Sequence, residues 1–170
     1  AMARLAGASP MNRIFDFIQP ALRRIAEASL AAMVVLTVAD VLGRYLLSFP
    51  IVGSVELTEM LMVAVIFSGI PLATAKGGHV SVDIVTLALG PRTRKAQAVL
   101  AHLVATASSL LFGFVTWQRA WAALELRDQT TMLSLPLAPM VFFMSVLLFV
   151  NALGNLVDLI RAILEPAFHD

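Results

Sequence analysis

The chain has 170 residues, of which 59% are hydrophobic and only 14% are charged, and its formal net charge is +1. A soluble domain carries about 25% charged residues, so this composition excludes an ordinary soluble domain and favours an integral membrane protein. The near-neutral charge gives no sign of a nucleic-acid or acidic partner. The absence of cysteine excludes disulfides, thiol catalysis and thiolate metal sites.

The first predicted membrane span covers residues 22–47, because about twenty apolar helical residues cross the roughly 30 Å of hydrocarbon in a bilayer. The preceding residues, 11–20, mix apolar side chains with Arg13 and Asp16 and end in Pro20. They are consistent with a short segment lying on the membrane surface and ended by the proline, or with an ordinary frayed terminus.

Asp40 and Arg44 lie four residues apart near the end of this span and therefore share one helical face. Asp40 is expected about one turn inside the membrane boundary, where an unpaired charge is costly. Two interpretations stay open. The pair neutralises itself, or one of the two residues reaches Glu56 or a partner subunit.

The second predicted span covers residues 57–75 and follows a turn-forming linker over residues 48–54. Glu56 and Glu59 place carboxylates at its beginning. Pro71 cannot donate a backbone hydrogen bond, so we expect it to kink the far end of the span.

Residues 80–90, between the second and third spans, are too few to cross a membrane. Their apolar residues share one helical face and Gly90-Pro91 is a helix stop signal, so we expect a short interfacial helix. His79 and Asp83, four residues apart at its start, are assigned to capping and orienting this helix.

The third and fourth predicted spans cover residues 96–117 and 132–157. The loop between them is expected to carry four charged residues, which are Arg119, Glu125, Arg127 and Asp128. Asn151 and Asn155 are again four residues apart. We expect both amides to face other helices rather than lipid, with hydrogen bonds worth about 1 kcal/mol each.

Lysine and arginine are distributed unequally between the two sides of the predicted membrane. Nine lie in the N-terminal segment, the segment after the second span and the C-terminal tail, and three lie on the other side. The positive-inside rule therefore predicts that both termini and the interfacial helix are cytoplasmic. Four acids would then lie on the outer face, namely Glu56, Glu59, Glu125 and Asp128.

The sequence contains no Gly-rich phosphate loop, no metal-ligand cluster and no nucleophile–base pair with usable spacing. Transport through the chain itself would show charges or broken helices near the membrane midplane, whereas the ionisable residues lie at the ends of the spans. We therefore expect no catalytic, cofactor or metal site. The pattern favours a subunit that packs against something larger.

Several motifs follow one another along the chain. In order they are Arg44-Tyr45, Pro50, Glu56 with a long apolar run to Gly69, His79 and Asp83, and the Ser-Leu-Pro that ends at Pro136. Their order and spacing, over about residues 20–160, resemble the small membrane subunit (DctQ type) of tripartite ATP-independent periplasmic (TRAP) transporters. Val55 precedes Glu56 where that family often has two adjacent acids.

The resemblance implies a multi-pass protein of the bacterial inner membrane. Its partners would be a large membrane subunit and a soluble periplasmic substrate-binding protein. In this family a sodium gradient drives uptake of organic acids such as dicarboxylates or sialic acid. The large subunit carries the substrate and ion sites and moves as an elevator. The small subunit would be a scaffold, not an enzyme, and would need no cofactor.

Two interpretations of the outer acids follow. The first, which we favour, pairs Glu56 with Arg44 across the first hairpin. In the second, Glu56, Glu59, Glu125 and Asp128 help to dock the binding protein or to orient the scaffold.

Two other classes of protein compete with this assignment. A haem-binding membrane anchor of a respiratory oxidoreductase would use histidines facing each other across the bilayer centre, but His79, His102 and His169 do not have that placement. A small self-assembling four-helix exporter would need an ionisable residue deep in a span, and Asp40 is too near the outer end.

Overall fold

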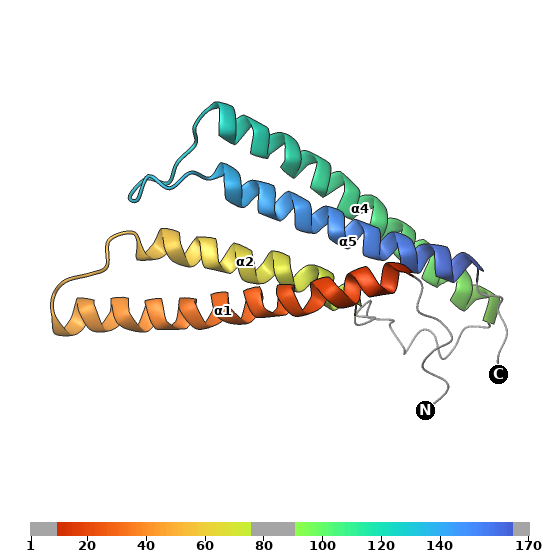
Figure 1. The fold of residues 1–170 in the computed structure, drawn as a ribbon, viewed down its shortest axis with the longest axis horizontal. Helices are drawn as coiled ribbons and strands as arrows, with labels where there is room; N and C mark the ends of the chain where they lie inside the picture. Colours follow the sequence, from red (N-terminus) through yellow and green to blue (C-terminus); the bar gives the residue numbers. More distant parts are fainter. Residues whose placement is uncertain (1–9, 76–90, 165–170) are drawn as a thin grey trace.

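The computed structural model describes residues 10–75 and 91–164. They form α1 (Pro10–Leu46), α2 (Ser54–Ala75), α4 (Pro91–Glu125) and α5 (Ala138–Leu164) (Figure 1). Each of the four helices is long and apolar enough to cross a membrane, which confirms the prediction of an all-helical protein with four spans. The predicted interfacial helix, with His79 and Asp83, lies outside the described residues.

The helices form two hairpins, α1 with α2 and α4 with α5, which are joined mainly through contacts between α2 and α5. Figure 1 shows the hairpins spreading apart toward the end that carries the α1–α2 and α4–α5 loops. We call this the loop end, and the opposite end, where α1 begins and α5 ends, the terminal end. The α5 helix is the most enclosed. Of its 18 most apolar consecutive residues 33% are buried, against 6% for α1.

The α1 helix is continuous through Pro20. The prediction that a surface segment ends at Pro20 is therefore wrong. A proline in a helix interior costs about 3 kcal/mol, mainly because its nitrogen cannot donate to the carbonyl four residues earlier. Long runs of good helix formers after Pro20, such as the residues from 21 to 32, outweigh this single defect.

The α4 helix extends well beyond the predicted span at both ends. Pro91 begins α4, which fits proline's preference for a first helical position. At the other end Arg119 and Glu125 lie in the helix and not in a loop, which corrects the prediction. The first polar residues mark the expected membrane boundary, whereas the helix itself continues past it.

A Schellman motif ends α4. The Asp128 N–H donates to the Ala123 carbonyl (3.0 Å) and the Arg127 N–H donates to the Leu124 carbonyl (3.3 Å). Arg127 adopts the left-handed conformation, with φ of 53°, that this motif requires.

The α5 helix begins at Ala138, six residues later than predicted from Met132. The residues before it form a compact turn. In this turn the Thr130 N–H donates to the Leu135 carbonyl (2.9 Å), and the Leu135 N–H donates to the Thr130 hydroxyl (3.1 Å). A single bridge between Gln129 and Pro136 closes the turn, so we call residues 129–136 the α4–α5 turn.

Small residues bring α4 and α5 together. Ala120, Ala123 and Ala152 are almost fully buried between helices. At Gly113 an added Cβ would lie 3.2 Å from the Phe149 ring, closer than most real contacts. Close approach through small residues is the usual mode of helix packing in membranes, where no hydrophobic effect drives helices together.

Candidate functional site

A buried amide connects three of the four helices. The Thr74 hydroxyl of α2 donates to Asn151 Oδ1 (2.7 Å), and Asn151 Nδ2 donates to the Ser109 hydroxyl of α4 (2.9 Å). Asn151 itself belongs to α5 and is only 6% exposed. We call Thr74, Ser109 and Asn151 the amide junction.

Asn155 supports this junction from the next turn of α5. Its Nδ2 donates to the Asn151 carbonyl (3.0 Å), and the residue is only 1% exposed. Both asparagines therefore face other helices and not lipid, as their spacing in the sequence predicted. In hydrocarbon an amide must find a protein partner, which explains why the two lie on the enclosed face of α5.

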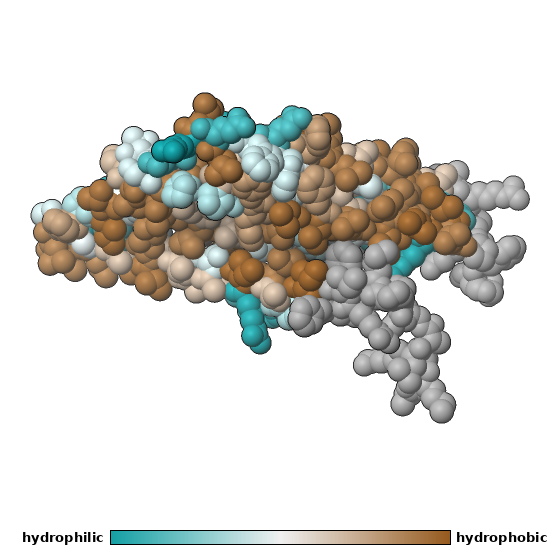
Figure 2. Space-filling view, turned by 45° about the horizontal axis from the view of Figure 1, so that its top comes forward, coloured by the Kyte–Doolittle hydropathy of each residue, from teal (hydrophilic) through white to brown (hydrophobic). Residues whose placement is uncertain are grey.

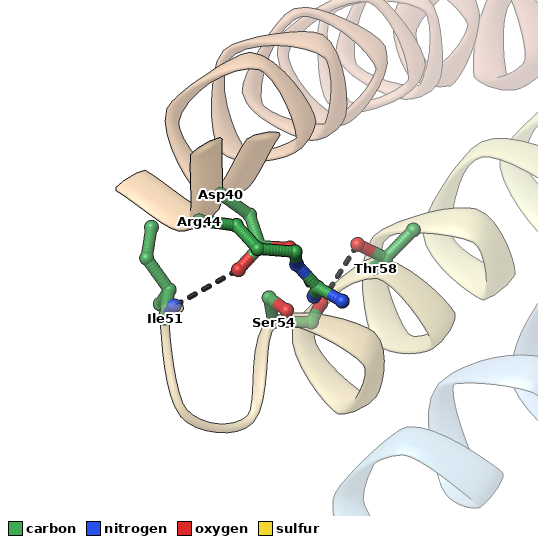
Figure 3. Close-up of polar contacts among 5 residues, drawn as sticks. All are labelled: Asp40, Arg44, Ile51, Ser54 and Thr58. Carbon is green, nitrogen blue, oxygen red and sulfur yellow. Dashed lines mark hydrogen bonds and ion pairs between the residues drawn. The ribbon is translucent and has the colours of Figure 1, made fainter. Parts of the chain in front are cut away.

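Asp40 closes the α1–α2 loop (Figure 3). One of its carboxylate oxygens accepts a hydrogen bond from Arg44 (2.8 Å), and the other accepts one from the Ile51 backbone N–H (2.9 Å). Of the two interpretations of this pair, the structure shows the internal Asp40–Arg44 ion pair. The sequence did not reveal the second contact, which ties the end of α1 to the start of α2.

Glu56 lies in the first turn of α2 and holds the α4–α5 turn. Its Oε1 accepts a hydrogen bond from the Met132 N–H (2.6 Å), and its Oε2 accepts one from the Leu133 N–H (3.0 Å). The preferred prediction that Glu56 pairs with Arg44 is therefore wrong. Arg44 already binds Asp40 on its own helix, and two consecutive backbone N–H groups form a natural anion-binding nest for the carboxylate.

Gly53 makes this contact possible. Its φ is +77°, and an added Cβ would lie 2.4 Å from the Leu133 Cγ. Both the backbone conformation and the close packing therefore require glycine. We call the contacts of Gly53 and Glu56 with Met132 and Leu133 the loop-end latch, because they join the two hairpins where they spread apart.

The remaining outer acids divide into two kinds. Asp128 is paired with Arg119 (2.8 Å). Glu59 and Glu125 are exposed, and neither forms an ion pair within the described part of the chain. Tyr45, the other outer candidate, is 80% exposed in the last turn of α1.

None of these groups forms a reactive assembly. Among the described residues no cluster of three or more His, Asp or Glu side chains could hold a metal ion. The polar side chains are used to join helices: Asn151 at one level of the bundle, Glu56 at another. Two predicted residues, His79 and Asp83, lie in the part of the chain that the structure does not describe.

The fold and these contacts define a multi-pass membrane protein whose polar groups hold four helices in place. Comparison with protein families makes the class more specific. The family described as "Tripartite ATP-independent periplasmic transporters, DctQ component" matches residues 33–164, well over half of the chain. The chain belongs to this family and is thus the small membrane component of a tripartite transporter, which confirms the resemblance seen in the sequence. A search of individual curated proteins gave no match.

Proposed function

We propose that this subunit is a static scaffold. It would widen the fixed part of a large elevator-type membrane subunit during sodium-driven uptake of an organic acid delivered by a periplasmic binding protein. The observation that carries the proposal is that few residues of these apolar helices are buried against one another. Among the 18 most apolar consecutive residues of each helix, only 6% are buried in α1 and 17% in α4.

The exposed apolar surface is continuous along these helices. Figure 2 shows brown residues over most of the visible helix surface. The large exposed residues of α1 include Leu30, Val34, Val35, Val38, Val41 and Leu42. Because α1 packs mainly on α2, most of its circumference is available to lipid and to a partner helix. A subunit of this shape gains contacts by lying beside a larger one.

A scaffold must keep its own shape, and two separate features of this chain support that role. The amide junction joins α2, α4 and α5 near the far end of the α2 span, and the loop-end latch joins the two hairpins at the loop end. Contacts at two levels resist hinge motion between the hairpins better than one contact could. The subunit would then remain rigid while the large subunit moves.

The charge distribution supports a placement in the inner membrane with both termini in the cytoplasm and the loop end in the periplasm. Glu59 and Glu125 then become the best candidates for contact with the binding protein, because Glu56 and Asp128 are engaged within the chain. For His79 and Asp83 we keep the structural assignment to a cytoplasmic interfacial helix. Replacing either with Ala should lower the yield of the complex without changing substrate specificity.

Reconstitution tests the proposal. The chain is coexpressed with its large subunit, purified, and placed in proteoliposomes with binding protein outside and an imposed sodium gradient. We expect a stable complex that takes up an organic acid only when the chain, the binding protein and sodium are all present. Elution of two well-folded but separate proteins, or equal uptake by the large subunit alone, would refute the scaffold role.

A further inference from the structure

The four described helices lie side by side in one row. The α1 helix packs on α2, α2 packs on α5, and α5 packs on α4. Figure 1, which views the molecule down its shortest axis, shows the helices in this order. Because the axes of packed helices are about 8–10 Å apart, α1 and α4 are separated by about 27 Å across the row.

The amide junction fixes the level of α4, by which we mean its position along the long axis of the molecule. Its hydrogen bonds place Ser109 of α4 level with Thr74 of α2 and Asn151 of α5. We therefore measure levels from the amide junction, toward the loop end or toward the terminal end.

A second contact fixes the level of α1. The hydrogen bond from the Ile51 N–H places Asp40 of α1 beside the start of α2, and Figure 3 shows Asp40 next to Ser54. The α2 span runs from Ser54 to Thr74, a rise of about 30 Å. Asp40 therefore lies about 30 Å from the amide junction, toward the loop end.

The apolar surface ends at different levels on the two outer helices at the loop end. Asp40 is the first charged residue of α1 on this side, about 30 Å from the amide junction. Arg119 is the first charged residue of α4 on the same side, and it lies ten residues or about 15 Å beyond Ser109. Glu59 of α2, between the two outer helices, has an intermediate level of about 22 Å.

The apolar surface is displaced in the same direction at the terminal end. Glu27 of α1 is 13 residues from Asp40, which places it about 10 Å on the loop side of the amide junction. Lys95 of α4 is 14 residues from Ser109, which places it about 21 Å on the terminal side. Asp158 of α5 again lies between them, about 10 Å on the terminal side.

A bilayer perpendicular to the long axis does not fit both outer helices. It would place Arg119, Glu27 or both within the hydrocarbon, where a charged side chain is costly. A displacement of about 15–30 Å across a row about 27 Å wide corresponds to an inclination of roughly 40°. The length of α1 agrees, because its span of 29 residues is about 44 Å long and crosses about 30 Å of hydrocarbon when it is tilted by about 45°.

We infer that the row of helices crosses the bilayer obliquely, with the membrane normal inclined by roughly 40° to the long axis of the molecule. The bilayer then meets α1 nearer the loop end and α4 nearer the terminal end. This placement brings the two loops to a similar depth, although the α1–α2 loop reaches further along the long axis than the end of α4 in Figure 1. The inference rests on the four helices as membrane spans and not on the proposed scaffold role.

Spin labels at two matched pairs of positions test this inference, and the absence of native cysteine makes the chain suited to them. Val35 of α1 and Leu124 of α4 share one level, about 22 Å from the amide junction toward the loop end. Ile25 of α1 and Phe114 of α4 share another, about 8 Å from it. All four side chains are exposed.

Each residue is replaced singly by cysteine and labelled in the whole chain in nanodiscs. Collisions of the label are measured with oxygen, which concentrates in lipid, and with a water-soluble nickel chelate. The oblique bilayer predicts opposite differences in the two pairs. The ratio of oxygen to nickel collisions should be several-fold higher for Val35→Cys than for Leu124→Cys, and several-fold higher for Phe114→Cys than for Ile25→Cys.

Equal ratios within each pair would overturn the inference, because a bilayer perpendicular to the long axis gives residues of one level the same depth. Val38→Cys and Leu126→Cys lie within one residue of a common level and are also exposed. They repeat the first comparison if one of its variants does not purify as a folded protein.

Discussion

Replacing Asn151 with Leu removes the centre of the amide junction while keeping a side chain of similar size. Two interhelical hydrogen bonds are lost, one to Thr74 and one to Ser109. Such bonds in membrane proteins average about 0.6 kcal/mol and reach about 1.7 kcal/mol. The expected loss of stability is therefore about 1.2 kcal/mol, which is about sevenfold in the unfolding equilibrium. Thr74 also donates to the Ile70 carbonyl of its own helix (3.3 Å), which favours the lower part of the range.

The assay is equilibrium unfolding of the purified subunit in mixed micelles, with Thr74→Val and the Thr74→Val/Asn151→Leu double variant completing a double-mutant cycle. We expect a coupling energy of about 0.6 kcal/mol between positions 74 and 151. Val146→Leu, a change on an exposed position of the same helix, is the control and should have almost no effect. Wild-type stability of Asn151→Leu, or strictly additive effects of the two changes, would refute the junction.

Three further predictions concern the loop end. Glu56→Gln replaces one acceptor oxygen by an amide that cannot accept from a backbone N–H, so the α4–α5 turn should be released and proteolysis after Arg127 should increase. Gly53→Ala places a methyl group 2.4 Å from Leu133 Cγ at a left-handed φ, and the backbone conformation alone should lower the stability by about 1–2 kcal/mol. Adding Leu133→Ala to this variant should recover only the part of the lost stability that is due to crowding. Reversing the charge of both Glu59 and Glu125 to Lys should weaken docking of the binding protein and reduce its salt dependence.

Each of these predictions has a contradicting result. Unchanged proteolysis of Glu56→Gln would mean that the turn is held by its own hydrogen bonds. Full stability of Gly53→Ala in unfolding measurements would contradict the close contact of the loops. For the acids, transport at the wild-type rate and with the wild-type salt dependence would exclude docking through them. Glu27→Lys, which reverses an exposed acid away from the loop end, is the control.

The sequence predicted the number of membrane spans but not the ends of their helices. Hydropathy reports where a helix meets water, and α4 continues for almost two turns past Arg119, the first charged residue after its apolar stretch. Its end depends on the left-handed conformation of Arg127, which no residue type demands. Pro20 was interpreted as the end of a surface segment, whereas α1 continues through it, and Pro91 was not recognised as the start of α4. Proline disfavours a helix interior without forbidding it, and at a first helical position it is favourable.

The candidate site was predictable where its contacts are local. The spacing of four residues placed Asp40 and Arg44 on one helical face, with two interpretations of the pair left open, and it placed Asn151 and Asn155 on an enclosed face. The partner of Glu56 could not be found in this way, because it is a pair of backbone N–H groups 76 and 77 residues away. Those groups become available only because the α4–α5 turn folds as it does, and the predicted helix start at Met132 concealed that turn.

We propose that this chain works beside a much larger membrane subunit, and purification from the native membrane is the simplest test of that association. The tagged chain is extracted in mild detergent and the proteins bound to it are identified. We predict recovery of one large, very hydrophobic protein with ten or more apolar spans, in a constant ratio to the chain. Recovery of the chain alone as a stable homo-oligomer, or together with a haem protein, would contradict the account.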